Sequence, residues 1–515
     1  MDPASDPGAD YDYRSEDANR PEIVAALEPR VDGDVRFDTY TRELYATDAS
    51  VYEELPIGVV APKSTADVAT VMEYCAENGV PVLPRGGGTS LAGQAVNEAV
   101  VLDFKRHMDG FVRFDPEAAT ARAQPGITLA RLNDQLEPHG LKYAPDPAWG
   151  DKSVLGGCIG NNSTGAHSLK YEKADGYIES VEAVLADGTV TTFGWVDVED
   201  LDERAAGAED GNIEARIYRE VQRIIEEDGD EIDERFPDLT RNVSGYNLDR
   251  LLADARERGA VNVGRLLAGS EGTLAFVTEA EVSLEPIPEA TAVVMLTYDG
   301  VLPAMRDVAP ILEHDPSAVE VMDDVFLDLA RDTPEFADLV ETLPDGTNST
   351  LLVEFYGASP ADAQQQIADL LADRLPEYGA EGDPNKGAAE VTEADVHAVD
   401  ALEAYDSDRQ AKFWKMRKAG LPILLSRTGD DKHWPFVEDT AVPAENLPEY
   451  VADIQELFES HDTFAAYYAH AGPGVLHIRP LLNLKTEAGI ETMEAIADSV
   501  TDLVVEYGGS VSGEH

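Results

Sequence analysis

Two histidines near the end of the chain have the types and the spacing to do chemistry. His470 and His477 flank a tight Gly-Pro-Gly turn at residues 472–474, and such a turn places the segments on either side of it next to each other. Two imidazoles held in this way could bind one divalent ion such as Zn²⁺ or Mn²⁺. A histidine pair with this separation also occurs in purely structural roles, so the pattern alone leaves both interpretations open.

Four loops rich in glycine and other small residues form a second signal. The loop at residues 84–94 has three consecutive glycines between two apolar stretches that predict strands. Such a backbone lets successive N–H groups converge on an anion, usually a phosphate. It fits neither the dinucleotide fingerprint nor the P-loop, so an ordinary glycine-rich turn is the alternative for this loop alone. Similar loops lie at residues 143–165, 241–248 and 267–274, and one extended cofactor threaded among all four explains them together.

Alternating strand and helix patterns position these loops. A chain of 515 residues is too long for one core and predicts two or three domains. Ahead of the first loop, a helix is expected to begin at Ser64 or Thr65 and to end at Gly79. After residue 288 a repeated β-α-β pattern is typical of a ferredoxin-like domain. The elements expected there are at residues 292–298, 302–312, 318–322, 349–357 and 361–375.

The composition is strongly acidic. The sequence has 39 basic and 101 acidic residues and a net charge of −62, which argues against nucleic acid or an anionic membrane surface as a direct partner. Molar salt shortens the Debye length to about 3 Å and removes most of the self-repulsion. We therefore predict a salt-adapted protein from a halophile, with an ordinary acidic enzyme as the alternative. The sequence shows no secretory signal and no long apolar run, which predicts a cytoplasmic protein without an integral membrane segment.

The loops together resemble a known family. Residues 84–94, 145–165, 245–248 and 269–274 look like the FAD domain of the vanillyl-alcohol-oxidase (PCMH) type. More narrowly, they resemble the branch of D-lactate dehydrogenase, glycolate oxidase and D-2-hydroxyglutarate dehydrogenase. The resemblance covers most of the chain.

This resemblance implies an α+β protein of two domains. A PCMH-type, VAO-like FAD-binding domain is expected over residues 51–287, after an N-terminal extension at residues 1–50. A ferredoxin-like α+β substrate (cap) domain is expected over residues 288–515. The family continues past this point, so the chain is expected to be truncated at its end.

The resemblance also implies the residues that contact FAD. Residues 85–90 are expected to cradle the pyrophosphate, and residues 156–165 with Glu271 and Gly272 to line the flavin and the ribityl chain. Members with a tethered flavin often have His where this chain has Thr89, so we expect non-covalent FAD. The expected contacts are Pro84, Arg85, Gly86, Gly87, Gly88, Thr89, Ser90, Gly93, Gln94, Pro145, Asp146, Gly156, Gly157, Gly160, Asn161, Asn162, Ser163, Gly165, Glu271, Gly272 and Val277.

For the histidine pair, the family pattern is His-Ala-Gly-Asp-Gly-Asn-Leu-His, whose histidines are metal ligands in several members. This chain keeps both histidines but has Pro473 for the Asp and Val475 for the Asn. Glu514 matches the family's third ligand. The resemblance therefore implies a Zn or Mn site made by His470, His477 and Glu514.

The remaining chemistry would bind and deprotonate a 2-hydroxy acid. The carboxylate of such an acid is best held by a planar arginine, and Arg417 matches the family's Trp-x-x-Arg clamp; a solvated helix position is the alternative. Lys432 and Arg479 are further candidates for substrate contacts. His515 is the first candidate for the base and His477 the second.

The expected activity is FAD-dependent oxidation of a D-2-hydroxy acid (D-lactate, D-2-hydroxyglutarate or glycolate) to the 2-oxo acid, with hydride transfer to flavin N5. Residues 430–443 resemble long relatives fused to iron–sulfur modules. Because Cys75 and Cys158 cannot ligate a Cys₄ cluster, any cluster is expected on a missing C-terminal part, which passes electrons to a quinone. Attachment to the inner face of the cell membrane is an alternative to a free cytoplasmic location.

Two alternative functions stay open at this point. One is a non-catalytic, FAD-carrying electron-transfer subunit of a larger oxidase complex. The other is an FAD enzyme of the same fold that acts on a sugar or an aromatic alcohol.

Overall fold

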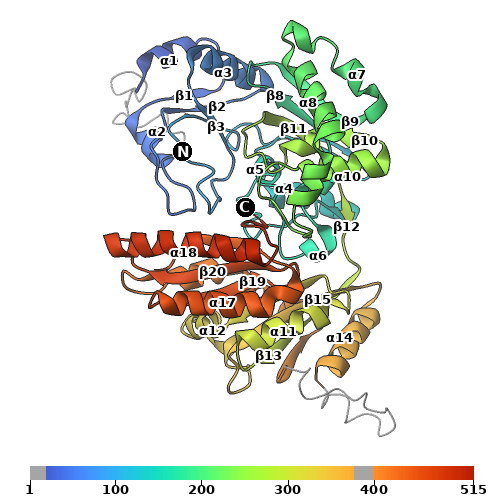
Figure 1. Cartoon of the computed structure of the whole chain (residues 1–515), viewed down its shortest axis with the longest axis vertical. Coiled ribbons are helices and arrows are strands. Elements are labelled where there is room, and N and C mark those ends of the chain that lie inside the picture. Colours follow the sequence, from blue (N-terminus) through green and yellow to red (C-terminus); the bar gives the residue numbers. More distant parts are fainter. Residues whose placement is uncertain (1–18, 376–397, 515) are drawn as a thin grey trace.

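The computed structural model of the chain describes residues 19–375 and 398–514. In Figure 1 the N-terminal half (residues 19–286) lies above the C-terminal half (the described residues from 290 on), and the end of the chain lies at their junction. His515, the first candidate for the base, and residues 1–18 of the expected N-terminal extension lie outside the described residues.

A small sheet holds the first glycine loop. Its strands and the helices around it are α1 (Pro21–Leu27), β1 (Asp34–Arg36), α2 (Thr39–Leu44), β2 (Gly58–Ala61), α3 (Thr65–Asn78), β3 (Val82–Arg85) and β4 (Val100–Asp103). The sheet order is β1-β2-β4-β3, and β4 pairs in parallel with β2 and with β3. Ser64 Oγ accepts a hydrogen bond from the Asp67 N–H at the start of α3, and Gly79 ends this helix with a φ of 63°, as the cap residues predict. Because β3 ends at Arg85, the glycine loop begins at the carboxyl edge of the sheet.

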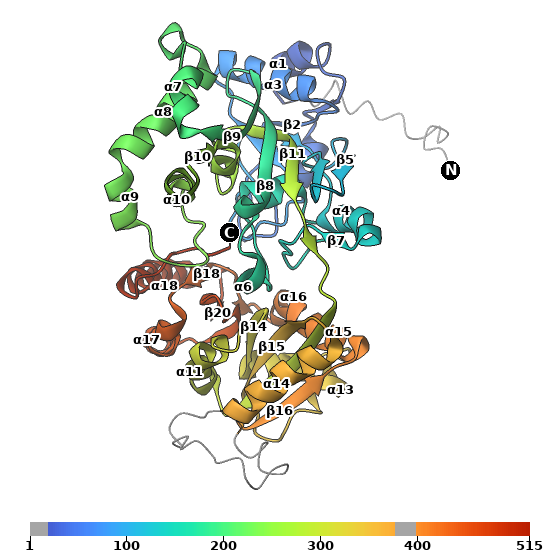
Figure 2. The same ribbon diagram turned by 90° about the vertical axis from the view of Figure 1, so that its right-hand side faces the viewer.

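A larger antiparallel sheet follows, in the order β10-β9-β8-β11-β6-β5. Its strands are β5 (Phe111–Asp115), β6 (Thr120–Ala123), β8 (Ile178–Val184), β9 (Val190–Asp197), β10 (Ala260–Asn262) and β11 (Phe276–Ser283), with β7 (Leu141–Lys142) and β12 (Glu285–Pro286) paired beside it. The helices are α4 (Leu129–Leu136), α5 (Leu155–Gly160), α6 (Ser168–Tyr171), α7 (Leu201–Arg204), α8 (Ile213–Glu227), α9 (Gly229–Arg235) and α10 (Leu248–Arg258). The short helix α5 packs closely: a Cβ on Gly156 would lie 2.5 Å from Pro125 Cβ. In the side view of Figure 2, α6 reaches the C-terminal half, where it contacts β14 (Ala318–Asp323).

The C-terminal half is an antiparallel sheet in the order β16-β13-β15-β14-β19-β20-β17, with β18 also paired to β20. Its other strands are β13 (Ala290–Tyr298), β15 (Ser349–Gly357), β16 (Asp400–Ala404), β17 (Lys432–His433), β18 (Val437–Ala441), β19 (Ala465–His470) and β20 (Val475–Leu482). The predicted β-α-β pattern is present, and both halves combine helices and strands, as predicted for an α+β protein. The sheet is wider than a single ferredoxin-like unit because β16 and β17 to β20 extend it.

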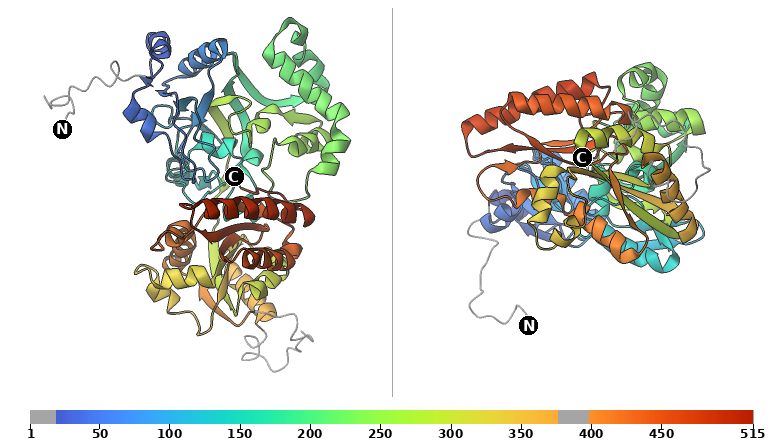
Figure 3. Two further views of the ribbon diagram at one scale, coloured as in Figure 1. Left: turned by 60° about the vertical axis from the view of Figure 1, so that its left-hand side comes forward. Right: turned by 90° about the horizontal axis from the view of Figure 1, so that it is seen from below.

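Helices cover both faces of this sheet (Figure 3). One face carries α11 (Val301–Leu312), α14 (Pro360–Arg374), α17 (Leu447–Ser460) and α18 (Glu487–Glu506). The other face carries α12 (Asp324–Arg331), α13 (Ala337–Val340), α15 (Ser407–Lys418) and α16 (Gly420–Leu425). Among the described helices, none is both long and apolar enough to span a membrane.

Candidate active site

One cavity of about 470 Å³ extends from the glycine loops of the N-terminal half to the sheet of the C-terminal half. At its far end lie Arg417, Tyr468, His470, His477, Arg479 and Glu514. The sequence-predicted FAD contacts that line it are Pro84, Arg85, Gly86, Gly87, Gly88, Thr89, Ser90, Gln94, Gly156, Gly157, Gly160, Asn161, Ser163, Glu271, Gly272 and Val277. The structure therefore brings the cofactor loops and the histidine pair to one cavity.

The first glycine loop packs against residues 152–154. A Cβ on Gly86 would overlap Val154, and one on Gly87 would overlap the Lys152 carbonyl oxygen. Gly88 has a φ of 65°, in the region that favours glycine. The glycines therefore let the loop lie flat on its neighbour with its backbone at the cavity, which fits an extended phosphate-bearing group.

Arg85 braces this loop. Its guanidinium donates to three backbone carbonyls, those of Ala95 (2.7 Å), Thr47 (2.7 Å) and Tyr45 (3.2 Å). These contacts hold the strand end and the far side of the loop together, so the positive charge supports the loop from behind.

Five of the expected FAD contacts do not line the cavity. Among them, Asp146 Oδ2 lies 2.8 Å from His167 Nδ1, and Asn162 Oδ1 accepts a hydrogen bond from the Asp175 N–H at 2.9 Å. A Cβ on Gly165 would overlap the Asp146 carbonyl oxygen. These residues shape the loops behind the cavity wall, as do Gly93 and Pro145.

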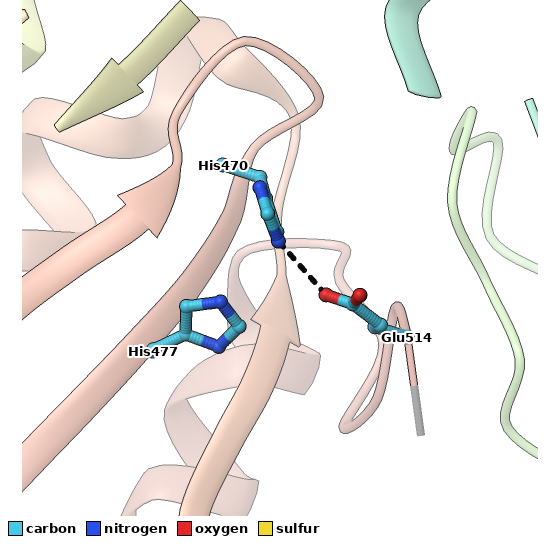
Figure 4. Close-up of side chains that lie close together, drawn as sticks. All are labelled: His470, His477 and Glu514. Carbon is cyan, nitrogen blue, oxygen red and sulfur yellow. Dashed lines mark ion pairs between the residues drawn. The ribbon is translucent and has the colours of Figure 1, made fainter. Parts of the chain in front are cut away.

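Strand pairing gathers the side chains at the far end. On β19 and β20, Tyr468 lies opposite His477 and Ala466 opposite Arg479. Because side chains alternate along a strand, His470 shares the sheet face of Tyr468, the face covered by α15 and α16. Ligand atoms of His470, His477 and Glu514 all lie within 4.8 Å of one another, and the three residues are buried. His470 Nε2 is 2.9 Å from a Glu514 oxygen (Figure 4).

The loop at residues 241–248 holds Glu514 in place. The fully buried Arg241 donates from Nε to the Gly513 carbonyl at 3.0 Å, and its Nη2 lies 2.8 Å from Glu514 Oε2. The Val243 N–H donates to the Ser512 carbonyl at 3.1 Å. This glycine-containing loop therefore holds residues 512–514 beside the cavity. It does not itself line the cavity, whereas the sequence analysis expects one cofactor to lie among all four loops.

Carboxylates that sequence reasoning missed stand behind both histidines. Glu320 Oε1 is 2.8 Å from His470 Nδ1, and Asp439 Oδ1 is 2.5 Å from His477 Nδ1. A shift of register in β18 and a φ of 59° at Asp439 turn both Asp439 and its neighbour Glu438 toward His477. The sequence signal that could have identified Glu320 is an acidic residue within an otherwise apolar predicted strand, residues 318–322.

The charge on Glu320 is stabilised by its neighbours. Burial alone would raise the pKa of Glu320, but His470 and Arg417 hold this pKa below its ordinary value. Each histidine thus has one ring nitrogen fixed by a carboxylate and the other available to an ion. Such carboxylate–histidine pairs commonly support bound metals. Two imidazoles and a carboxylate fit a Zn²⁺ or Mn²⁺ site.

Two of the three predicted substrate cations lie at the cavity. Arg417 is 5% exposed and Arg479 is fully buried, and both lie against the Tyr468 ring. Burial, followed by repulsion from Arg417, lowers the pKa of Arg479 to about 9, so it is still a cation at neutral pH; it forms an ion pair with Glu438. Lys432 does not line the cavity: its amine donates to the carbonyls of residues 425 and 427, at the C-terminal end of α16.

The fold and this cavity are those expected of a flavin-binding domain joined to a second α+β domain. Residues 56–194 match the family described as FAD binding domain, and residues 287–515 match the family described as FAD linked oxidases, C-terminal domain. The first match includes the glycine loops at residues 84–94 and 143–165, and the second includes the histidine pair and Glu514.

Curated relatives share this arrangement. The D-2-hydroxyglutarate dehydrogenase of Pseudomonas putida is 32% identical over 97% of this chain, and that of Escherichia coli is 33% identical over 94%. The chain spans about half the length of these relatives, 48% and 46%. The glycolate oxidase subunit GlcD of Bacillus subtilis is 27% identical, with 94% of this chain and 86% of the relative covered.

Solved structures show the same fold. An alkyldihydroxyacetonephosphate synthase aligns with a TM-score of 0.63 at 18% identity over 96% of this chain and 82% of its own. A 4-ethylphenol oxidase from Gulosibacter chungangensis aligns with a TM-score of 0.61 at 15% identity, over 96% of this chain and 88% of its own.

Proposed function

We propose that this chain is the catalytic part of an FAD-dependent dehydrogenase that oxidises a D-2-hydroxy acid to the 2-oxo acid. One observation carries the proposal: a single cavity joins the cofactor loops to Arg417, the histidine pair and Glu514. The names of the relatives support a hydroxy acid as the substrate, and D-2-hydroxyglutarate, D-lactate and glycolate are the candidates.

Arg417 binds the carboxylate of the substrate. Arg417 lines the cavity and is 5% exposed, so its guanidinium can reach an anion there. An arginine fork gives a bidentate, oriented contact with a carboxylate. Arg479 adds a second positive charge at the same end of the cavity.

The other polar residues hold a proton or an ion. His470, His477 and Glu514 would ligate Zn²⁺ or Mn²⁺, which would lower the pKa of the substrate hydroxyl. His477 accepts a proton on Nε2 only when that nitrogen is free of an ion, so it serves as ligand or as base. His515, outside the described residues, is the first candidate for the base.

Bound FAD would supply the acceptor for the hydride that leaves C2 of the acid. We expect FAD to be non-covalent, because Thr89 at the cavity offers a hydroxyl, 3.2 Å from Ser153 Oγ, where a tethering histidine would be needed. The electrons would then pass to a quinone or to an iron–sulfur protein or domain.

An anaerobic absorbance titration in molar KCl tests the proposal. A panel of D- and L-2-hydroxy acids, together with the achiral glycolate, is added to the purified flavoprotein, and we expect one D-acid or glycolate to bleach the visible flavin band. If none of the acids reduces the flavin, the proposal is overturned and an FAD-carrying electron-transfer subunit is favoured. If a sugar or an aromatic alcohol reduces it instead, the substrate belongs to that class and not to the hydroxy acids. Acid precipitation of the same sample should release the flavin into the supernatant.

A further inference from the structure

Glu320 is a buried carboxylate in the middle of the C-terminal sheet. It lies on β14, is fully buried, and belongs to the part of that strand that pairs with β19, where Val321 lies opposite Ala469. Its side chain shares the face of Met322 and Tyr468, under α15. A charge in this position is costly unless it is paired and hydrogen-bonded, so its partners indicate why it is there.

Glu320 contacts the metal site and the carboxylate clamp at the same time. Its two oxygens lie 2.8 and 3.0 Å from His470 Nδ1, and Oε2 lies 2.6 Å from Arg417 Nη2. The three residues come from three different elements, β14, β19 and α15. One carboxylate therefore ties together two side chains that sequence analysis assigned to separate tasks.

The contact with His470 selects one form of the imidazole. In the neutral imidazole, a proton on Nδ1 would be donated to Glu320, so Nε2, which faces Glu514 at 2.9 Å, is the nitrogen left to bind an ion between them. Partners of this kind fix the tautomer and the orientation of a metal-binding histidine.

The contact with Arg417 sets the direction of the guanidinium. Nη2 forms an ion pair with Glu320, and the same side chain lines the cavity. Because the guanidinium is planar, holding one end fixes the plane in which the remaining donors point.

We infer that Glu320 is a positioning residue shared by the metal site and the carboxylate clamp, so that loss of its charge disturbs both sites together. The inference rests on the proposed function in naming the ligands of the two sites, a divalent ion and a 2-oxo or 2-hydroxy acid. Glu320 itself does not need to touch either ligand.

The test compares Glu320→Gln with a matched control, Asp323→Asn. Asp323 is a buried carboxylate on the same strand that caps α12 and accepts from the N–H groups of Phe326 and Tyr467. Its substitution replaces a buried carboxyl group without touching His470 or Arg417. Burial raises the pKa of Asp323 to about 8, so this control tests the loss of a buried carboxyl group on β14, whereas Glu320→Gln also removes a charge. The FAD-loaded proteins are titrated with Mn²⁺, and separately with 2-oxoglutarate, whose binding is read from the shift of the flavin absorption band.

We expect Glu320→Gln to weaken Mn²⁺ binding by about 10–100-fold, as for other partners of ligating histidines, and to weaken 2-oxoglutarate binding at least tenfold. Asp323→Asn should leave both affinities unchanged, even where it lowers the melting temperature. The inference is overturned if Glu320→Gln leaves either affinity at the wild-type value, if Asp323→Asn reproduces its effects, or if the wild-type protein binds neither ligand.

These readouts separate this inference from the proposed function. Both are binding measurements and require no turnover. A wild-type protein that binds Mn²⁺ and 2-oxoglutarate but whose flavin no hydroxy acid reduces would contradict the proposed oxidation while still deciding the role of Glu320.

Discussion

His167 and Glu354 join the two halves of the molecule through an ion pair, with Nε2 and Oε2 2.7 Å apart. His167 comes from the N-terminal half, and its Nδ1 lies 2.8 Å from Asp146. Glu354, on β15, also accepts a hydrogen bond from Trp414 Nε1 at 3.0 Å. Because Trp414 precedes Arg417 on α15, this ion pair connects the interface between the halves to the helix that carries the clamp.

The first prediction concerns the pH dependence of this pair. Burial lowers the pKa of His167, but Asp146 and Glu354 outweigh it and raise this pKa to about 10. A histidine whose pKa is raised in the folded state adds stability that is complete below about pH 6.5 and is lost as the pH rises to about 10. The loss is at most about 1.4 kcal/mol per pH unit.

We therefore expect the difference in unfolding free energy between the wild type and His167→Gln to shrink as the pH rises from 6.5 to 10. Denaturant titrations at several pH values measure it. His314→Gln is the control, since His314 pairs with the partly exposed Asp373 inside the C-terminal half. A difference that stays constant over this pH range would contradict the assignment.

The second prediction concerns the turn between the two histidine strands. Gly474 has a φ of 75°, and a Cβ there would overlap the Val442 carbonyl oxygen. Gly259 at the end of α10 has a φ of 65°, but a Cβ there meets no atom within 4 Å. Both Ala variants carry backbone strain of about 1–3 kcal/mol, and only Gly474→Ala adds a clash.

Gly474→Ala should consequently lower the melting temperature more than Gly259→Ala and should also weaken Mn²⁺ binding, which Gly259→Ala should leave unchanged. Thermal unfolding and a Mn²⁺ titration of both variants measure this. If both variants lost the same amount of melting temperature and Mn²⁺ affinity, the turn would have to accommodate the added methyl group without a clash, which contradicts the prediction.

Local signals in the sequence were sufficient for much of the fold. Ser64, expected to begin the first helix, accepts from the Asp67 N–H at the start of α3, and Gly79 ends this helix as expected. The predicted strand at residues 349–357 is β15, with the same bounds. Caps, turns and period-2 burial depend on neighbouring residues, so a single sequence reveals them.

The missed parts of the site depend on long-range pairing. Glu320 meets His470 across 150 residues of sequence, and this contact requires the register between β14 and β19. The contact between Asp439 and His477 depends on an irregularity in the register of β18. The resemblance predicts Lys432 as a substrate contact, but its amine donates to carbonyl groups at the C-terminal end of α16. A cation is favourable there because of the helix dipole.

The third prediction concerns the ion. His477→Ala and Glu514→Gln each remove one of the three buried groups at the cavity, so we expect Mn²⁺ affinity to fall at least tenfold in both. His461→Ala, at the end of α17 and outside this group, should bind as the wild type does. Isothermal titration measures the affinities. Dialysis against a chelator should slow flavin reduction by the acid, and added Mn²⁺ or Zn²⁺ should restore it; wild-type affinity in both site variants would exclude these ligands.

The fourth prediction concerns salt. With a net charge of −62, the folded chain repels itself, and the Debye length falls from about 10 Å at 0.1 M salt to about 3 Å at 1 M. We expect the melting temperature to rise with KCl, most steeply below 1 M. Sucrose added at low salt should not reproduce this steep rise in melting temperature, because sucrose does not screen charge. A melting temperature that is independent of KCl would contradict salt adaptation.

The fifth prediction concerns the clamp. Arg417→Lys keeps a positive charge at the cavity but loses the planar fork of the guanidinium, while Glu320 still has a cation nearby. We expect the KM for the hydroxy acid to rise about tenfold or more with a smaller change in kcat, because a lysine gives a single, less oriented contact. Arg417→Met should cost more, about 2–5 kcal/mol, because it also leaves Glu320 short of one partner.

Arg409→Lys on the same helix is the matched control for the clamp. Arg409 lies over the Phe413 ring with its guanidinium carbon 5.6 Å from the ring centre and does not line the cavity. Steady-state kinetics of both variants with the best hydroxy acid separate the two positions. If Arg417→Lys and Arg409→Lys shared the wild-type KM, the carboxylate would have to bind at Arg479, the other buried cation at this end of the cavity.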